Sequence, residues 1–91
     1  FNEDISGWDV SSVVNMQSMF RGASSFNQDI SGWDVSSIPG TTQMGAMFRN
    51  ATSFDQDLSG WCVANVPSLP TDFDNNTPAW VLPKPIWGTC P

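Results

Sequence analysis

The chain spells nearly the same twelve residues three times, and this period limits its possible folds more than any other feature. The copies read "FNEDISGWDVSS" from Phe1, "FNQDISGWDVSS" from Phe26 and "FDQDLSGWCVAN" from Phe54. The third copy starts three residues late because "PGT" is inserted at 39–41. A period in the twenties is typical of folds in which each unit buries its apolar face against its neighbours.

Within each copy, the spacing of apolar residues predicts a strand followed by a helix. "ISGWDV" (5–10) has apolar residues at i, i+3 and i+5, the leucine-rich type of spacing, and ends in strand-like alternation. Apolar residues then recur every three or four positions over 13–20, as on one face of a short helix. We therefore expect a leucine-rich-repeat-like α/β solenoid of about three coils, each with a short parallel strand and a short helix. Its core should hold Trp8, Trp33 and Trp61, together with Met16, Met19, Phe20, Met44, Met47 and Phe48.

The third copy changes in the way expected of a cap. Pro67 and Pro70 fall in the segment that should be helical, where proline cannot sit in a helix interior. The apolar residues of the tail should cover the last coil. The first coil has no capping segment before it, which predicts either a longer parent array or something that stacks on this end. The predicted organisation is repeat coils over 1–66 (1–25, 26–53, and 54–66 as the start of the last coil) and a capping segment over 67–91.

Two cysteines, Cys62 and Cys90, stand in a chain that is short and poor in lysine. We interpret them as a disulfide formed in an oxidising compartment, with a metal pair or two free thiols as the alternatives. Cys62 takes the place of Asp9 and Asp34 in the earlier copies, so the bond would fasten the tail to the last coil.

Charge and composition exclude several classes of function. The net charge is −6 with three basic residues, which argues against binding to nucleic acid or to anionic lipid. The absence of histidine excludes a His-dependent triad and a typical zinc site. No stretch is long enough to span a membrane, so direct membrane insertion is not expected.

The recurring words "FNQDISGWDVSS", "NM…MF" and "GA.SF" resemble the 26-residue repeat of bacterial surface proteins, a family of unknown function abundant in mycoplasma surface lipoproteins. The units are also similar to the leucine-rich repeats of BspA-type surface proteins. This resemblance implies a secreted or cell-surface location and a leucine-rich-like solenoid. It implies adhesion for some relatives, but no binding residues that could be transferred to this chain.

Stacked coils would place the acidic residues in files. Asp4, Asp29 and Asp57 form one file, for which we weigh hydrogen bonds that cap the loops against a bound Ca²⁺. Asp9 and Asp34 form another, and with Ser11 and Ser36 they make the predicted binding face, against the alternative of a merely solvated surface. Asn50 and Asn75 begin N-x-S/T sequences that could be glycosylated if the source is eukaryotic.

The sequence leads to a non-enzymatic module at the cell surface or outside the cell, which adheres to a protein or a glycan. The alternative is a structural spacer or filament subunit that stacks end to end on copies of itself. No cofactor is expected apart from the Ca²⁺ considered above. Repeated, exposed aspartates offer no cleft for the paired carboxylates of a glycosidase.

Overall fold

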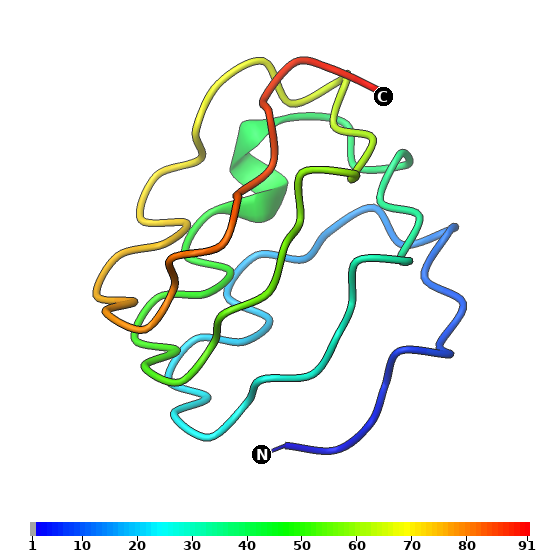
Figure 1. Ribbon diagram of the computed structural model, residues 1–91. Helices are drawn as coiled ribbons and strands as arrows, with labels where there is room; N and C mark the ends of the chain where they lie inside the picture. Colours follow the sequence, from blue (N-terminus) through cyan, green and yellow to red (C-terminus); the bar gives the residue numbers. More distant parts are fainter. Residues whose placement is uncertain (1) are drawn as a thin grey trace.

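The chain is built from loops and turns, as the computed structural model shows for residues 2–91 (Figure 1). Phe1, the first apolar position of the period, lies outside the described residues. The single regular element in the described part is the 3-10 helix η1 (Thr41–Met44). It begins within the inserted "PGT", after Gly40 in an extended conformation.

The predicted leucine-rich-repeat-like α/β solenoid is wrong. No strand forms within residues 2–91, so there is no parallel sheet, and the segment 13–20 is irregular chain followed by turns rather than a helix. Ser18 shows the physical reason: its φ of 58° lies in the left-handed region, which interrupts an α-helix. Of the architectural features predicted together with the solenoid, the disulfide is the one that the structure supports.

The backbone N–H groups of the turns donate to two kinds of acceptor. The N–H groups of Met19, Arg21 and Ala23 each donate to the carbonyl three residues back. Every second N–H group from Met16 to Gly22 donates instead to a carbonyl of the next segment, at N···O distances of 2.7 to 2.9 Å. A helix would have kept both sets within one segment. The bonds to the next segment run from Met16 to Gln43, Ser18 to Gly45, Phe20 to Met47 and Gly22 to Arg49.

The same arrangement joins the second segment to the third. Ala46, Phe48 and Asn50 donate to the carbonyls of Thr71, Phe73 and Asn75. The residues with positive φ recur at matching places: Ser18, Ala46 and Asp72 in one position, and Gly22, Asn50 and Asn76 in the other. Residues one sequence period apart therefore contact one another, although they form no sheet.

Aromatic rings fill the core between the segments. Phe26 stacks on Phe54 with ring centroids 5.6 Å apart, and Phe20 stacks on Phe48 at 5.4 Å. Trp33 and Trp61 are buried as predicted, but Trp8 is 56% exposed and Met19 is 39% exposed, which corrects their placement in the core. The cause is the arrangement of the segments: the indoles of Trp33 and Trp61 each lie against an earlier segment, whereas none among the described residues covers Trp8.

The tail lies against residues 54–66 through polar as well as apolar contacts. Trp80 is buried, its ring 4.8 Å from that of Phe54 and its Nε1–H donating to the Gln56 carbonyl. Asp55 Oδ1 accepts the N–H groups of Val81 and Leu82. Of the five apolar side chains of the tail that were expected to cover the last coil, Trp80 is buried and Trp87 packs against the core, with its ring 4.8 Å from that of Phe73. The other three are exposed: Val81, Leu82 and Ile86.

Candidate functional site

Five aspartates share one local structure, which is set by the sequence D-x-S. In each, the aspartate Oδ1 accepts the backbone N–H of the serine two residues on, at 2.9 to 3.1 Å. In four of them, all except Asp29, the serine hydroxyl also donates to this oxygen, at 2.5 to 2.6 Å. This geometry is the loop-capping role considered for the first file, and it extends to the predicted binding face. The pairs are Asp4–Ser6, Asp9–Ser11, Asp29–Ser31, Asp34–Ser36 and Asp57–Ser59.

Hydrogen bonding fixes the charge of these carboxyl groups. The serine hydroxyl, and then the serine N–H, hold the pKa of Asp9 and of Asp34 below the ordinary value of 3.8. The charge of Asp9 opposes this at Asp34 by raising its pKa, a small contribution that reflects the proximity of the two carboxylates. Both groups are exposed, and both are ionised at neutral pH. The predicted binding face therefore carries two neighbouring negative charges in fixed orientations.

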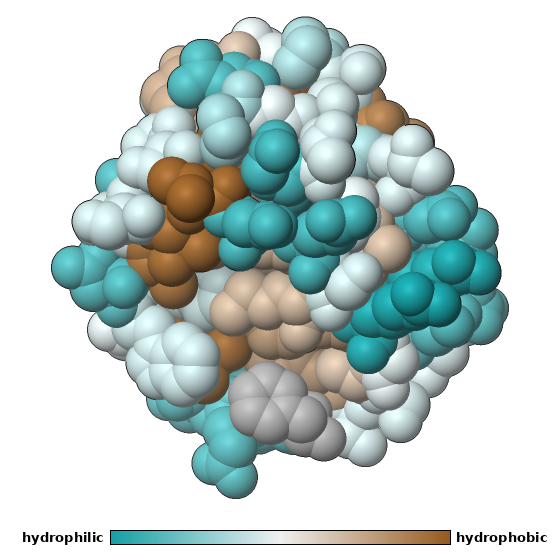
Figure 2. Space-filling view, turned by 180° about the vertical axis from the view of Figure 1, so that it is seen from behind, coloured by the Kyte–Doolittle hydropathy of each residue, from teal (hydrophilic) through white to brown (hydrophobic). Residues whose placement is uncertain are grey.

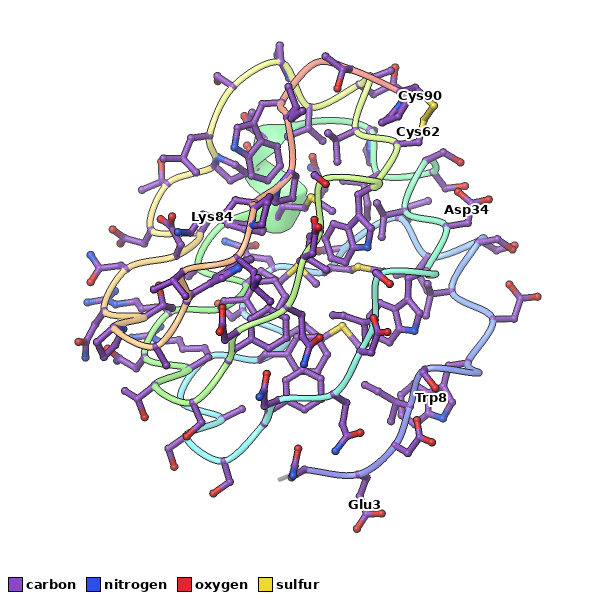
Figure 3. All side chains as sticks on the ribbon, in the orientation of Figure 1. Glu3, Trp8, Asp34, Cys62, Lys84 and Cys90 are labelled. Carbon is purple, nitrogen blue, oxygen red and sulfur yellow. A yellow bond between two sulfur atoms is a disulfide. The ribbon has the colours of Figure 1, made fainter. Side chains whose placement is uncertain are left out.

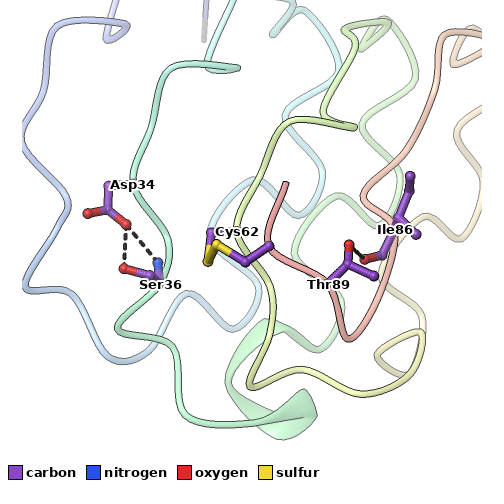
Figure 4. Close-up of a disulfide and its surroundings, with 6 residues drawn as sticks. Asp34, Ser36, Cys62, Ile86 and Thr89 are labelled. Atoms are coloured by element: carbon purple, nitrogen blue, oxygen red, sulfur yellow. Dashed lines mark hydrogen bonds between the residues drawn. A yellow bond between two sulfur atoms is a disulfide. The ribbon is translucent and has the colours of Figure 1, made fainter.

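The disulfide lies at one end of the file formed by Asp9 and Asp34. Cys62 and Cys90 are joined, and the close-up shows Asp34 with its bonded Ser36 on the loop beside Cys62 (Figure 4). Thr89 donates its hydroxyl to the Ile86 carbonyl, and the Val63 N–H donates to the Thr89 carbonyl. The predicted pairing of the two cysteines is confirmed. The neighbouring hydrogen bonds order the chain that leads to Cys90.

A calcium site receives no support from the arrangement of the aspartates. Within the part of the chain that the structure describes, no three acidic or cysteine side chains gather closely enough to hold a metal ion. Asp4, Asp29 and Asp57 each bond their own serine instead, and the same hydroxyl and N–H groups lower the pKa of each.

A second row of polar contacts joins the segments edge to edge. Asn2 Oδ1 accepts the N–H of Asn27 at 2.9 Å, and Asn27 Oδ1 accepts the N–H of Asp55 at 2.8 Å. Beside them, Gln28 Nε2 donates to Asn2, and Gln56 Nε2 donates to Asn27. The first segment has Glu3 where the later ones have glutamine, and a carboxylate cannot donate such a bond.

The indole N–H groups form a third row, which the sequence reasoning missed. Trp33 Nε1 donates to the Ile5 carbonyl at 3.1 Å and Trp61 Nε1 to the Ile30 carbonyl at 3.0 Å. Trp8 Nε1 has no such acceptor among residues 2–91. The available signal was the position of the tryptophans in the period, but periodicity alone does not identify the acceptor.

A hollow of about 270 Å³ opens beside η1 where the insertion widens the second segment. Gly45 lies at it and is buried; a Cβ added there would meet the Thr42 carbonyl oxygen at 3.4 Å. Its other lining side chains are mostly neutral and polar, namely Gln17, Thr41, Thr42 and Thr71, with Asp72 adding a carboxylate.

The two glycosylation candidates lie close together. The Asn50 N–H donates to the Asn75 carbonyl, and Asn50 Oδ1 accepts a bond from Asn76 Nδ2. Asn75 is exposed and donates its amide to Asp72 Oδ1, whereas Asn50 is half-buried. Asn75 is thus the more accessible of the two, and modification of either stays a prediction.

Comparison with known protein families matches residues 1–80 to the family described as "Mycoplasma protein of unknown function, DUF285". The chain belongs to this family. No curated protein and no solved structure matches it. The match covers all three sequence units and ends at Trp80, before the part of the tail that carries Cys90. The family assignment confirms the mycoplasma resemblance, but it does not extend to the BspA-type proteins.

Proposed function

We propose that the chain is a non-enzymatic module that acts outside the cell or on its surface by binding a protein or a glycan. The observation that carries the proposal is the pair of turns at Asp9 and Asp34. Each exposed carboxylate is held by two bonds from its serine. Groups that are already ordered lose little conformational entropy on binding, so such a face suits the recognition of cationic or hydroxyl-rich groups.

The disulfide between Cys62 and Cys90 supports the location outside the cell, because such a bond persists in oxidising compartments. As a separate finding, no helix within residues 2–91 has the length and apolarity needed to cross a bilayer. A relationship to BspA-type surface proteins is part of the proposal, and it concerns sequence and location rather than fold.

The titration of the carboxyl groups supports a role without catalysis. General acid catalysis near neutral pH uses carboxyl groups whose pKa is raised, usually by burial. Every carboxyl pKa in residues 2–91 that departs clearly from its ordinary value is lowered by serine hydrogen bonds, and these groups are exposed.

The alternative function, a spacer that stacks on copies of itself, draws support from the exposed Trp8. The net charge of −6 opposes it, because like-charged copies repel one another. Light scattering over a range of concentrations separates the two functions. The binding module predicts a monomer throughout, whereas growth of the particle mass with concentration supports the spacer.

The binding proposal is tested with the double variant Asp9→Asn, Asp34→Asn. Asparagine keeps the oxygen that caps each turn, so the variant removes charge while keeping the loop. Its matched control is Asp4→Asn, Asp29→Asn, which removes the same charge from the other file. Attachment to a panel of matrix proteins and glycans should fall for the first variant and persist for the control. Equal attachment by both folded variants and the native chain would overturn the proposal.

A further inference from the structure

The hollow beside η1 lies where a side chain is missing from a row of equivalent positions. Gln17, Gly45 and Thr71 each precede the first left-handed residue of their segment, so they are equivalent in the three segments. The backbone bonds agree, because the Ser18 N–H donates to the Gly45 carbonyl and the Ala46 N–H to the Thr71 carbonyl. All three equivalent residues line the hollow. The glycine in the middle leaves a gap between the side chains of its two neighbours.

The backbone does not require glycine at position 45. Its φ of −58° and ψ of 138° lie in a region that any residue adopts. A Cβ added there would lie 3.4 Å from the Thr42 carbonyl oxygen, 3.6 Å from the Thr71 carbonyl oxygen and 3.9 Å from Gln17 Nε2. A side chain at Gly45 would therefore occupy the space that these groups surround. Open space, rather than backbone strain, distinguishes glycine from other residues at this position.

The polar side chains around this space are not used within the fold. The hydroxyl groups of Thr41, Thr42 and Thr71 and the amide of Gln17 make no hydrogen bond within residues 2–91. Each of these groups can both donate and accept. The inserted "PGT" supplies Thr41, so the insertion adds a polar wall that the first and third segments lack. Groups from all three segments are thus available to one ligand.

The charge of the hollow is largely balanced. Asp72 is its one charged lining residue. Asp72 Oδ1 accepts a bond from Asn75 Nδ2 at 3.1 Å, and Oδ2 lies 3.5 Å from Arg49 Nη1. The guanidinium group offsets the negative charge, while the carboxylate, with about four acceptor sites, can still accept further hydroxyl groups. This arrangement favours a neutral ligand that is rich in hydroxyl groups.

The exposed large apolar side chains take no part in the lining of the hollow. The space-filling view from behind shows brown and tan side chains gathered at the centre and left of that face (Figure 2). In the hollow, apolar contacts come only from threonine methyl groups and Ala46, which argues against a purely apolar ligand. The exposed large apolar residues within 2–91 are Trp8, Val14, Met19, Leu69, Val81, Leu82 and Ile86.

We propose that this hollow binds one neutral sugar ring. Its volume of about 270 Å³ is just below the range of pockets for drug-sized ligands, which begins at about 300 Å³, and so suits a single ring. The hydroxyl, amide and carboxylate groups would bind the sugar hydroxyls, and the methyl groups would contact the C–H face of the ring.

The inference goes beyond the proposed function, because the hollow shares no residue with the face formed by Asp9 and Asp34. In the stick view, Asp34 lies at the right-hand side of the molecule, whereas η1 lies to the left of its centre (Figure 3). The two sites can therefore be tested separately.

The test follows the threonine methyl signals by NMR while small molecules are added to the protein. The probes are glucose, galactose, mannose and N-acetylglucosamine, each as the free sugar and as the methyl glycoside, with inorganic phosphate and methylammonium as charged controls. At least one sugar should shift the signals of Thr41, Thr42 and Thr71 in a saturable way. The dissociation constant should be about 1–10 mM, as expected for so few ligand atoms. Thr77 and Thr89, which do not line the hollow, should keep their signals unshifted.

Two variants locate the binding in the hollow. Gly45→Ala places a methyl group among the lining groups and should weaken sugar binding by about tenfold, while the unfolding midpoint holds or rises. Its matched control is Gly32→Ala, at an exposed glycine where the added Cβ meets nothing within 4 Å, and this variant should bind as the native chain does. Thr71→Val removes one hydroxyl group and should weaken binding by about two- to tenfold, the range for one hydrogen bond.

Three results would overturn the inference. They are the absence of a saturable shift with every sugar, a larger response to phosphate or methylammonium than to any sugar, and native affinity in both Gly45→Ala and Thr71→Val. Binding of the methyl glycoside supports the terminal ring of a glycan as the ligand, and binding of the free sugar alone supports a free sugar. The variant Asp9→Asn, Asp34→Asn leaves the hollow intact, so a failure here is distinguishable from a failure of the proposed function.

Discussion

Removing the disulfide should cost about 3.5 kcal/mol of unfolding free energy. The bond joins residues 28 apart in sequence, and the chain-entropy model for a loop of that length gives about this value. For a domain of this size, it corresponds to a fall of about 15–25 °C in the midpoint of thermal unfolding. The double variant Cys62→Ala, Cys90→Ala tests the value by urea and thermal denaturation, and the reduced native chain serves as its control.

The tail should stay in place in this variant under native conditions. Trp80 Nε1 still reaches the Gln56 carbonyl, and the Leu58 N–H still donates to the Pro83 carbonyl. The indole proton of Trp80 should therefore stay protected while the unfolding midpoint falls. A loss below 1 kcal/mol would refute the reasoning, as would a Trp80 signal that becomes unprotected before the rest of the chain unfolds.

Three further predictions use variants of single features. Trp33→Phe should lower the free energy of unfolding by about 2–3 kcal/mol in chemical denaturation, because it removes a buried hydrogen bond to Ile5 and leaves a cavity. Trp8→Phe, the matched change at the exposed position, should change this free energy by less than about 0.5 kcal/mol. Similar losses for the two variants would contradict the contact. Ala46→Gly should raise stability by about 1 kcal/mol, since the φ of Ala46 is 54° and glycine adopts that region without strain; a fall in its melting midpoint would count against this backbone. The unfolding midpoint should stay constant from neutral pH to about pH 5 and fall as the pH drops through the lowered pKa values of five aspartates, because the folded pKa of each lies below its unfolded value. A midpoint that stays constant down to pH 2 would be inconsistent with the hydrogen bonds of these aspartates. The aspartates concerned are Asp4, Asp9, Asp29, Asp34 and Asp57.

The sequence predicted which residues meet, but not the backbone conformation that brings them together. Identical spacing in the copies predicted that Asp9 lies beside Asp34 and that Trp33 is buried, and both are found. Periodicity reports which side chains share a face, and apolar residues every three or four positions fit a helix and a chain of turns equally well. The left-handed φ values of Ser18 and Ala46, neither of which is glycine, produce turns instead of a helix. No feature of the local sequence indicates these φ values.

For a related reason, part of the candidate site could be predicted from the sequence and part could not. The bonds of Asp4 and Asp9 to Ser6 and Ser11 follow from short-range rules, because an aspartate often accepts the N–H two residues on. The exposure of Trp8 does not follow from such rules. It depends on which segments cover one another, and that is a property of the whole chain rather than of the unit.

The most direct test of the account is hydrogen exchange at the tryptophan indoles. The central claim is that residues one period apart are bonded between segments. It predicts slow exchange for the indole protons of Trp33, Trp61 and Trp80, and fast exchange for Trp8. Equal exchange at Trp8 and Trp33 in the folded chain would contradict it.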